Sequence, residues 1–123
     1  MTALADLRTV ANIGDLKWER LVGEGQPDQD TWWHNISFDE ATGQGSYFYK
    51  MGPGSRSEAH VHEGPEEFYV IEGALTDHDG HTYRAGDFAS LAPGSRHYST
   101  TIDGCVLVVT HRGPLVEIED AAL

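Results

Sequence analysis

Two histidines one residue apart, His60 and His62, precede a Gly64-Pro65 pair and two adjacent glutamates, Glu66 and Glu67. Successive side chains of a strand point to opposite faces, so both imidazoles share one face with their Cα atoms roughly 6.6 Å apart. That separation lets both rings bind one metal ion. Gly64-Pro65 ends the strand and turns the chain back, which brings a glutamate toward the histidines. The alternation of apolar residues after the turn does not choose between Glu66 and Glu67.

A third imidazole, His97, follows a Pro93-Gly94 turn at the start of another predicted strand. Three neutral imidazoles and one carboxylate form a borderline donor set that suits Fe(II), Mn, Co, Ni, Cu or Zn. A six-coordinate ion would keep two positions open for substrate or dioxygen, whereas the four side chains would close a tetrahedral ion. The same residues therefore support either a catalytic or a structural site.

These residues must lie on strands, and the turn residues spaced along the chain predict where those strands begin and end. Gly, Pro-Gly and Asp-Gly pairs recur between short stretches rich in β-branched and aromatic residues, which is typical of an antiparallel sandwich or barrel. A helical turn is expected only within residues 1–16. Asp79-Gly80 predicts a two-residue hairpin turn with positive φ angles, and the tail from Glu117 is expected to fray. The predicted strands are Lys17–Val22, Thr31–Phe38, Ser46–Met51, Glu58–His62, Glu67–Glu72, Ala74–His78, His81–Arg84, Phe88–Ala92, His97–Ile102 and Cys105–Arg112.

Length and composition limit the organisation and the partners. A chain of 123 residues with 39% hydrophobic content predicts one domain over 1–123: an N-terminal extension (1–16), a barrel (about 17–112) and a C-terminal tail (113–123). Twenty acidic residues against eight basic ones give a net charge of −12, which would repel nucleic acids and anionic lipid surfaces. Apolar runs such as Val106–Val109 are far too short to span a membrane.

The compartment is predicted from the cysteine count and the first residues. Asp6 and Arg8 interrupt any apolar stretch near Met1, so no signal peptide is expected. A lone Cys105 cannot form an internal disulfide, which fits a reducing compartment. We expect a cytoplasmic protein in which Cys105 serves as a small buried hydrophobe.

The spacing of the candidate ligands resembles the first cupin motif at every interval: Gly54, five residues, His60, one, His62, three, Glu66, six, Gly73. The interval to Gly73 selects Glu66 over Glu67. A second motif is similar, running from Gly86 to His97, although Ala92 stands where the motif has a proline and Thr101 where it has an asparagine. The resemblance implies an all-β, antiparallel fold, the cupin double-stranded β-helix or jelly-roll barrel, with His60, His62, Glu66 and His97 as metal ligands.

Residues 66–109 most resemble the ChrR-type branch of the cupins. That branch includes the zinc-binding cupin domain of certain anti-sigma factors and small dioxygenases acting on β-diketones and hydroxyacetophenones. The diketone enzymes have a three-histidine iron site without the glutamate, so Glu66 departs from them and agrees with the zinc domain. The resemblance implies a mononuclear Fe(II) dioxygenase acting on a small diketone or hydroxyketone. Its alternatives are a non-catalytic zinc module, structural or sensory, and an isomerase or lyase with a histidine base.

The remaining polar and aromatic residues have simpler interpretations. Tyr98, Arg56, Phe48 and Tyr49 are the candidate pocket residues, although core packing suits the aromatic side chains and surface exposure the arginine better. The other histidines have no partner at ligand spacing and are expected at surface or hairpin positions; they are His34, His78, His81 and His111. Asp77 and Asp79 are expected in a solvated hairpin. Small cupins often pair through a sheet edge, so the resemblance also implies a homodimer.

Overall fold

The computed structural model describes residues 2–23 and 26–123, in which eleven strands and three 3-10 turns occur. The strands are β1 (Glu19–Gly23), β2 (Gln26–Asn35), β3 (Gln44–Met51), β4 (His60–His62), β5 (Glu66–Asp77), β6 (Thr82–Arg84), β7 (Phe88–Leu91), β8 (Arg96–His97), β9 (Ser99–Thr100), β10 (Cys105–Arg112) and β11 (Leu115–Glu117). The turns are η1 (Leu4–Asp6), η2 (Ile13–Asp15) and η3 (Asp120–Ala122). The helical turn expected within residues 1–16 is present as η1 and η2, but η3 lies outside the range to which helical structure was expected to be confined.

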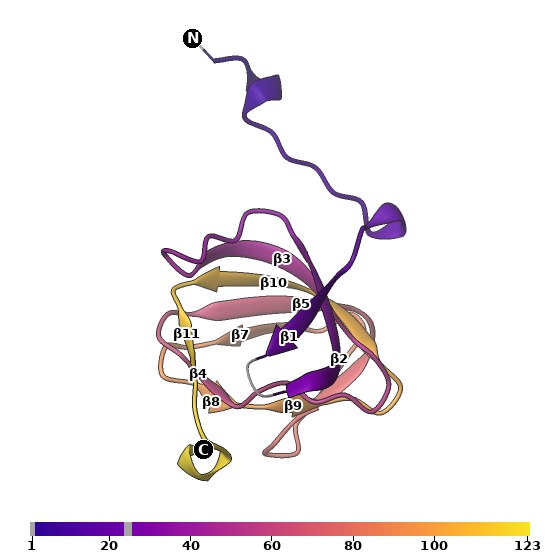
Figure 1. Cartoon of the computed structure of the whole chain (residues 1–123), viewed down its shortest axis with the longest axis vertical. Helices are drawn as coiled ribbons and strands as arrows, with labels where there is room; N and C mark the ends of the chain where they lie inside the picture. The colour runs from indigo at the N-terminus through magenta and orange to yellow at the C-terminus, as the bar shows by residue number, and fades with distance from the viewer. Residues whose placement is uncertain (1, 24–25) are drawn as a thin grey trace.

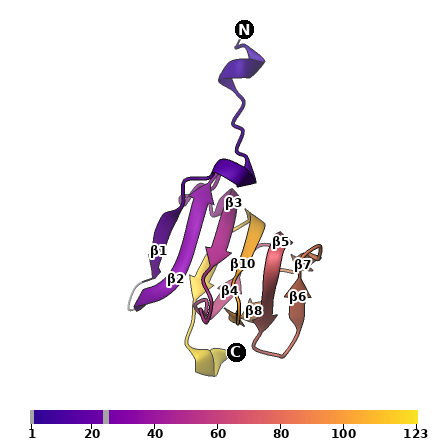
Figure 2. The ribbon, with the colours of Figure 1, turned by 90° about the vertical axis from the view of Figure 1, so that its right-hand side faces the viewer.

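The strands form two antiparallel sheets that face each other across the barrel (Figures 1 and 2). The larger sheet has the order β1-β2-β3-β10-β5-β6, with β7 and β9 also paired to β5. The smaller sheet has the order β11-β4-β8. The expectation of an all-β, antiparallel barrel is confirmed. Within the described residues, no helix is both long and apolar enough to cross a membrane.

Strand register divides the side chains of the larger sheet between the barrel interior and its outer surface. β10 lies between β3 and β5, with Leu107 opposite both Tyr49 and Val70. Because the side-chain period of a strand is two, this register turns one set of residues inward as the core. The buried core cluster contains Met51, Phe68, Val70, Leu75, Tyr83, Cys105, Leu107 and Val109. Burial of Cys105 confirms its expected role as a small hydrophobe.

Two predicted strands, Glu67–Glu72 and Ala74–His78, are one continuous strand, β5. The division was expected at Gly73, which has a φ of 77°. A Cβ atom there would lie 2.1 Å from the Gly104 carbonyl oxygen, so only glycine lets β10 approach this closely. Gly73 therefore permits a close strand contact and does not end the strand.

The predicted strand His97–Ile102 is divided into β8 and β9. Its first part pairs with β4 in the smaller sheet, and its second part pairs with β5 in the larger one. The chain thus crosses from one sheet to the other at Tyr98. Sequence patterning cannot show this crossing, because both parts remain extended and β-prone.

The hairpin between β5 and β6 turns through three residues, 78–80, and not through the two expected at Asp79-Gly80. The Gly80 N–H donates to the Asp77 carbonyl at 2.8 Å, and the Asp77 N–H donates to the His81 carbonyl at 2.9 Å. Gly80 has a φ of 93°, whereas Asp79 has no positive φ. A tight turn followed by a left-handed residue is a common three-residue hairpin loop.

The C-terminal segment 113–123, expected to be a tail that frays from Glu117, contributes a strand. β11 pairs with β4, with Leu115 opposite His62 and Glu117 opposite His60. The carbonyl of Ala59 also accepts a hydrogen bond from the Ile118 N–H at 2.9 Å. The histidine strand therefore lies between β11 and β8, which fixes both of its edges.

Candidate metal centre

Strand pairing brings three histidines to one point of the barrel. His60 and His62 point inward from β4, and His97 on β8 stands directly opposite His60 in the antiparallel pair. One ring nitrogen from each residue lies within 4.8 Å of the other two. The ring centroids are 4.7 Å (His60 to His62), 4.6 Å (His60 to His97) and 5.0 Å (His62 to His97) apart. The structure therefore brings together the three histidines selected by the cupin motifs.

The two adjacent glutamates face opposite sides of the larger sheet. Glu66 lies opposite the inward-facing His111, and its Oε2 is 2.7 Å from His62 Nε2. Glu67 instead pairs with Arg112 at 2.7 Å on the outside of the barrel. The compact group of ring nitrogens does not extend to Glu66 among the described residues. Glu66 thus adjoins the cluster, and its service as a fourth ligand stays a prediction.

Hydrogen bonds orient the rings of His60 and His97. The His60 Nδ1 lies 2.7 Å from the Glu58 carbonyl, which can only accept, so this nitrogen carries the proton and leaves Nε2 with a lone pair. The His97 Nδ1 lies 2.9 Å from Asp77 Oδ1. Carbonyl and carboxylate partners of this kind fix the tautomer of metal-binding histidines. Both rings therefore direct Nε2 away from these partners.

The hydrogen bonding of the buried imidazole nitrogens shows whether the site suits a metal. Both ring nitrogens of His62 and the Nε2 of His97 are buried without a hydrogen-bond partner among the residues described. The short contact from His62 Nε2 to Glu66 lacks hydrogen-bond geometry, although the two atoms are 2.7 Å apart. Buried polar atoms without partners are costly and uncommon. Three converging nitrogens beside a carboxylate would be satisfied by a divalent transition metal, so the donor set fits one.

Asp77 is a site residue that sequence reasoning missed by assigning it to a solvated hairpin. It is buried at the end of β5 and accepts hydrogen bonds from Tyr83 Oη at 2.6 Å and Ser99 Oγ at 2.6 Å, besides its contact with His97. Burial alone would raise its pKa, but the hydrogen bonds from these three side chains outweigh burial and lower the pKa. Asp77 is thus an ionised carboxylate that orients the His97 ring.

We expect Asp77→Asn to weaken metal binding by about 10- to 100-fold, the usual cost of losing the partner of a ligand histidine. The amide can present its NH₂ to His97 Nδ1 and favour the wrong tautomer. Titration of the metal-free protein with Zn²⁺ and with Fe(II) measures the effect. The matched control is Asp79→Asn, since Asp79 is exposed in the same hairpin. Equal affinities for the two variants would show that Asp77 does not position His97.

His111 is the second residue that was missed, and the expectation of a surface position for it is wrong. It is buried, its Nε2 lies 2.8 Å from Tyr47 Oη and 3.6 Å from Glu66 Oε2, and its ring stacks on Tyr47. The signal was present in the sequence: His111 shares the face of Leu107 and Val109 in a period-two strand. The surface interpretation holds for His78 and His81, which are exposed, while His34 is half-buried.

The charges around the centre alter the ionisation of its groups. Burial lowers the pKa of His60 to about 4, and the neighbouring His97 adds to that effect. Burial would also lower the pKa of His97, but the bond to Asp77 outweighs it and the net shift is upward. Burial would raise the pKa of Glu66, yet the contact with His62 and the nearby His111 lower it, so the carboxylate stays ionised.

These shifts predict how acid affects metal binding. A metal requires unprotonated imidazoles, so protons compete through the group with the highest pKa. His97, with its raised pKa, should therefore lose its metal-binding form before His60, whose pKa is about 4. We expect metal affinity to fall by up to about tenfold per pH unit below the His97 pKa. Metal titrations from pH 8 to 5 measure this slope, and an affinity that is constant over the range would contradict a histidine site.

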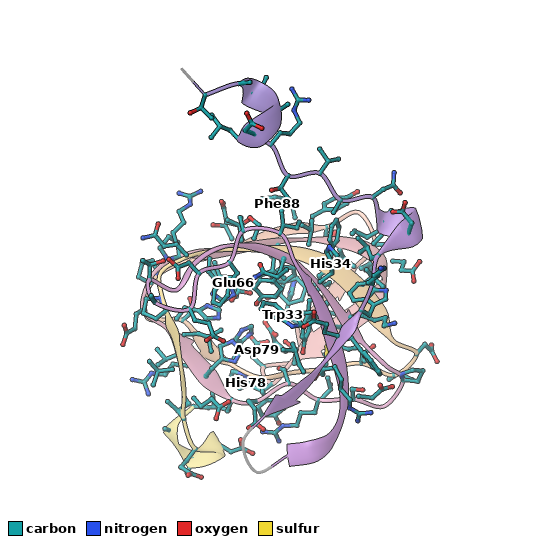
Figure 3. All side chains as sticks on the ribbon, turned by 45° about the horizontal axis from the view of Figure 1, so that its top comes forward. Trp33, His34, Glu66, His78, Asp79 and Phe88 are labelled. Carbon is teal, nitrogen blue, oxygen red and sulfur yellow. The ribbon has the colours of Figure 1, made fainter. Side chains whose placement is uncertain are left out.

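A cavity of about 490 Å³ adjoins the histidines. His60, His97 and Glu66 form part of its wall, and apolar side chains from the larger sheet form much of the rest; these include Trp33, Phe38, Tyr47, Tyr49, Met51, Phe68, Leu75, Leu107 and Val109. Figure 3 labels Trp33 and Glu66 on two of the strands that contribute to it. This volume is in the range that accommodates a small organic molecule.

Only one of the four candidate pocket residues is among the described residues lining this cavity. Tyr49 lines it, whereas Phe48, the next residue of β3, points outward. The Arg56 guanidinium stacks on Tyr98 at 3.8 Å and pairs with Asp120 at 2.5 Å, away from the cavity lining. Neither Phe48 nor Tyr98 belongs to the buried core cluster, so the core-packing role expected for them is not observed, and neither lines the cavity.

Comparison with known proteins agrees with this geometry. The family model described as the ChrR cupin-like domain matches residues 7–115. The chain belongs to this cupin family. No curated protein matches the chain, so the remaining comparisons concern solved structures.

Three solved structures share the fold of this cupin at low sequence identity. The acetylacetone dioxygenase from Acinetobacter johnsonii is 22% identical with a TM-score of 0.69, over 78% of this chain and 68% of that one. The polyketide cyclase RemF from Streptomyces resistomycificus is 22% identical with a TM-score of 0.68, over 91% and 86%. The Rhodobacter sphaeroides complex of SigE with the anti-sigma ChrR gives 18% and 0.63, over 81% of this chain and 51% of that one. The identities establish similarity of fold alone.

Proposed function

We propose that this cupin binds one divalent transition metal through His60, His62 and His97 and acts as a dioxygenase on a small oxygenated substrate, a diketone or hydroxyketone. The observation that carries the proposal is the opening of the three-histidine cluster onto a 490 Å³ apolar cavity. A purely structural metal site has no need of such a cavity. Fe(II) is the proposed ion, and the same donors would also accept Zn, Mn, Ni, Co or Cu.

The residues of the chain have separate parts in this function. A bound divalent metal would supply Lewis-acid and redox chemistry. The Glu58 carbonyl and the Asp77 carboxylate hold His60 and His97 in orientation before any ligand arrives. The apolar side chains of the lining offer water few hydrogen-bond partners, and a substrate that displaces water from them would strengthen polar interactions at the histidines.

Tyr47 supplies a fixed polar group on the apolar wall. Its hydroxyl is hydrogen-bonded to His111 Nε2 at 2.8 Å, and burial lowers the pKa of His111, which favours the neutral ring. Burial, followed by the charge of Glu66, raises the pKa of Tyr47 and keeps the phenol protonated. The phenol oxygen thus retains lone pairs that can accept a hydrogen bond from a substrate hydroxyl or enol.

The test begins with protein that is purified without added metal, loaded anaerobically with Fe(II), and mixed with a panel of β-diketones and hydroxyketones. We expect a new visible absorption band on mixing. Admitting air should bleach the band with about one dioxygen consumed per substrate cleaved, as measured with an oxygen electrode. Neither a band nor oxygen uptake for any member of the panel would overturn the dioxygenase proposal.

A non-catalytic zinc module is the second candidate, and the position of Glu66 favours it. Its Oε2 lies 2.7 Å from His62 Nε2 and is held ionised, so a fourth donor is at hand to complete a tetrahedral ion. Metal analysis of the native protein separates the candidates. Tightly held zinc without ketone-dependent oxygen uptake would support the module.

The two glutamates give a matched pair of variants for the fourth ligand. We expect Glu66→Gln to weaken metal binding by about tenfold or more, because the carboxamide is neutral and a poorer donor. Glu67→Gln should leave binding unchanged, since Glu67 faces outward toward Arg112. Competition with a chromophoric chelator measures both affinities. Loss of metal from Glu67→Gln but not from Glu66→Gln would show that the motif-based assignment is wrong.

A further inference from the structure

The charged side chains that line the cavity beside the histidines are all acidic. They are four glutamates: Glu40, Glu58, Glu66 and Glu117. The eight basic residues of the chain all belong to the described part of it, and none of them lines the cavity. A cleft that carries charges of one sign between low-dielectric walls concentrates ligands of the opposite sign. The lining therefore favours a ligand with positive charge.

The four carboxylates differ in depth. Glu66 is buried beside His62, Glu58 is half-buried, and Glu40 and Glu117 are exposed. A divalent metal held by the histidines would be countered by Glu66 at the inner end of the cavity. The other three carboxylates have no ion pair among the residues that the structure describes. A ligand would thus meet a metal cation at one end of the cavity and negative side chains toward the other.

Glu58 is the carboxylate best placed to recognise a cation. Its backbone carbonyl accepts a hydrogen bond from His60 Nδ1 at 2.7 Å, so the residue lies directly beside the metal centre. Its Oε1 is buried without a hydrogen-bond partner among the described residues. A carboxylate oxygen that is removed from water without a partner is costly, and a cation in the cavity would offset that cost.

The charged neighbours of Glu58 leave its carboxylate available to a ligand. Arg56 lies two residues before it, but the Arg56 guanidinium pairs with Asp120 at 2.5 Å. Strand β11 runs beside β4 and places Glu117 opposite His60 (Figure 1). Glu58 and Glu117 therefore line the cavity from adjoining segments with like charges. A cation beside both carboxylates would be attracted by each of them.

An organic cation suits this end of the cavity better than a second metal ion. The compact group of metal-binding atoms found among the described residues consists of the three histidines and includes none of the four glutamates. The lining also contains aromatic side chains, among them Trp33 and Phe38, which can contact hydrocarbon and attract an ammonium group through their π faces.

We propose that the cavity selects small molecules that carry an ammonium group, and that Glu58, assisted by Glu117, recognises this group. The inference rests on the proposed metal-binding function, because the oxygen atoms of the ligand would face the histidines while its ammonium group lies against Glu58. The substrate class is thus an amino-substituted ketone or diketone. A ligand with a carboxylate in the same place is rejected by the like charge of the lining.

Three hydroxamates with the same metal-binding head and different tails test this selection. β-Alanine hydroxamate ends in an ammonium group, butyrohydroxamate in a methyl group, and succinic monohydroxamate in a carboxylate. Each is titrated calorimetrically into the full chain loaded with redox-inert Zn²⁺, at about 150 mM salt, which screens long-range attraction to the net charge. We expect the ammonium probe to bind about tenfold more tightly than the methyl probe, and the carboxylate probe about tenfold more weakly.

Neutral variants assign the preference to particular residues through the ratio of affinities for the ammonium and methyl probes. In Glu58→Gln, which keeps the backbone carbonyl that orients His60, the ratio should fall to about one. In Glu117→Gln it should fall by about threefold, since an exposed charge contributes less. Glu72→Gln is the matched control, because Glu72 is exposed, lies outside the lining, and changes the net charge equally when replaced. Its ratio should equal that of the wild type.

Binding to the zinc-loaded protein is measured separately from oxygen uptake, so the two proposals can fail separately. Equal affinities for the three probes, or a wild-type ratio in Glu58→Gln, would overturn the ammonium preference and leave the dioxygenase proposal standing. The expected order of affinities without ketone-dependent oxygen uptake would support recognition by Glu58 and overturn the dioxygenase proposal alone. Failure of all three probes to bind would overturn both.

Discussion

His97→Ala is expected to abolish stoichiometric metal binding, with affinity reduced by more than about 100-fold. Loss of a residue that only orients a ligand already costs about 10- to 100-fold, and His97 is proposed to be a ligand itself. Water replaces a buried imidazole poorly, because its entry also leaves Asp77 without the charge-assisted partner at 2.9 Å. Metal content of protein purified from the same culture conditions measures the effect. His60→Ala and His62→Ala should behave in the same way.

Exposed histidines supply the control for this series. His78→Ala and His81→Ala remove imidazoles from the hairpin between β5 and β6, outside the cluster, and should leave metal content unchanged. Full metal content in all three inner variants would contradict the proposed centre. Loss of metal in the exposed variants as well would point to adventitious binding at the surface.

Removal of the metal is expected to destabilise the barrel substantially. A ligand that binds only the folded state at a thousand times its dissociation constant stabilises that state by about 4 kcal/mol. For a domain of this size that corresponds to roughly 15 °C in melting temperature. The physical reason lies in both ring nitrogens of His62 and in the Nε2 of His97, which are buried and otherwise lack hydrogen-bond partners among the described residues. Melting followed by circular dichroism, with and without a chelator, measures the shift.

The His97→Ala variant controls for direct effects of the chelator. Because this variant should hold no metal, its melting temperature should be low and should not change when the chelator is added. An unchanged melting temperature for the wild type after verified metal removal would show that the barrel packs independently of the centre. It would also favour a catalytic metal over a structural zinc.

Local patterning determined much of the fold. Strand β10 was predicted with its observed bounds, Cys105–Arg112, because its β-prone run is bounded by turn residues on both sides. Motif spacing selected His60, His62 and His97, which the structure brings together. Such information is local: an interval of one residue in a strand already places two side chains on one face.

Pairing between strands decided what alternation along a single strand left open. Alternation along β5 does not separate Glu66 from Glu67; the motif interval to Gly73 selected Glu66, and the register with β10 places Glu66 opposite the inward-facing His111. The register of β10 with β3 brings His111 into contact with Tyr47, a residue 64 positions away in the sequence. A register shift of one residue would reverse every one of these assignments, and no single strand carries that information.

The part that only tertiary structure decided is the support of the centre. Asp77 belongs to a hairpin whose sequence reads as solvated, yet β9 folds over it and delivers Ser99 while β8 delivers His97. Its burial depends on the chain crossing from one sheet to the other at Tyr98, a step without a sequence signal. The chain thus specified the ligands through short intervals, which strand geometry converts directly into positions. It specified their orientation through long-range contacts, which exist only once both sheets have closed around the cavity.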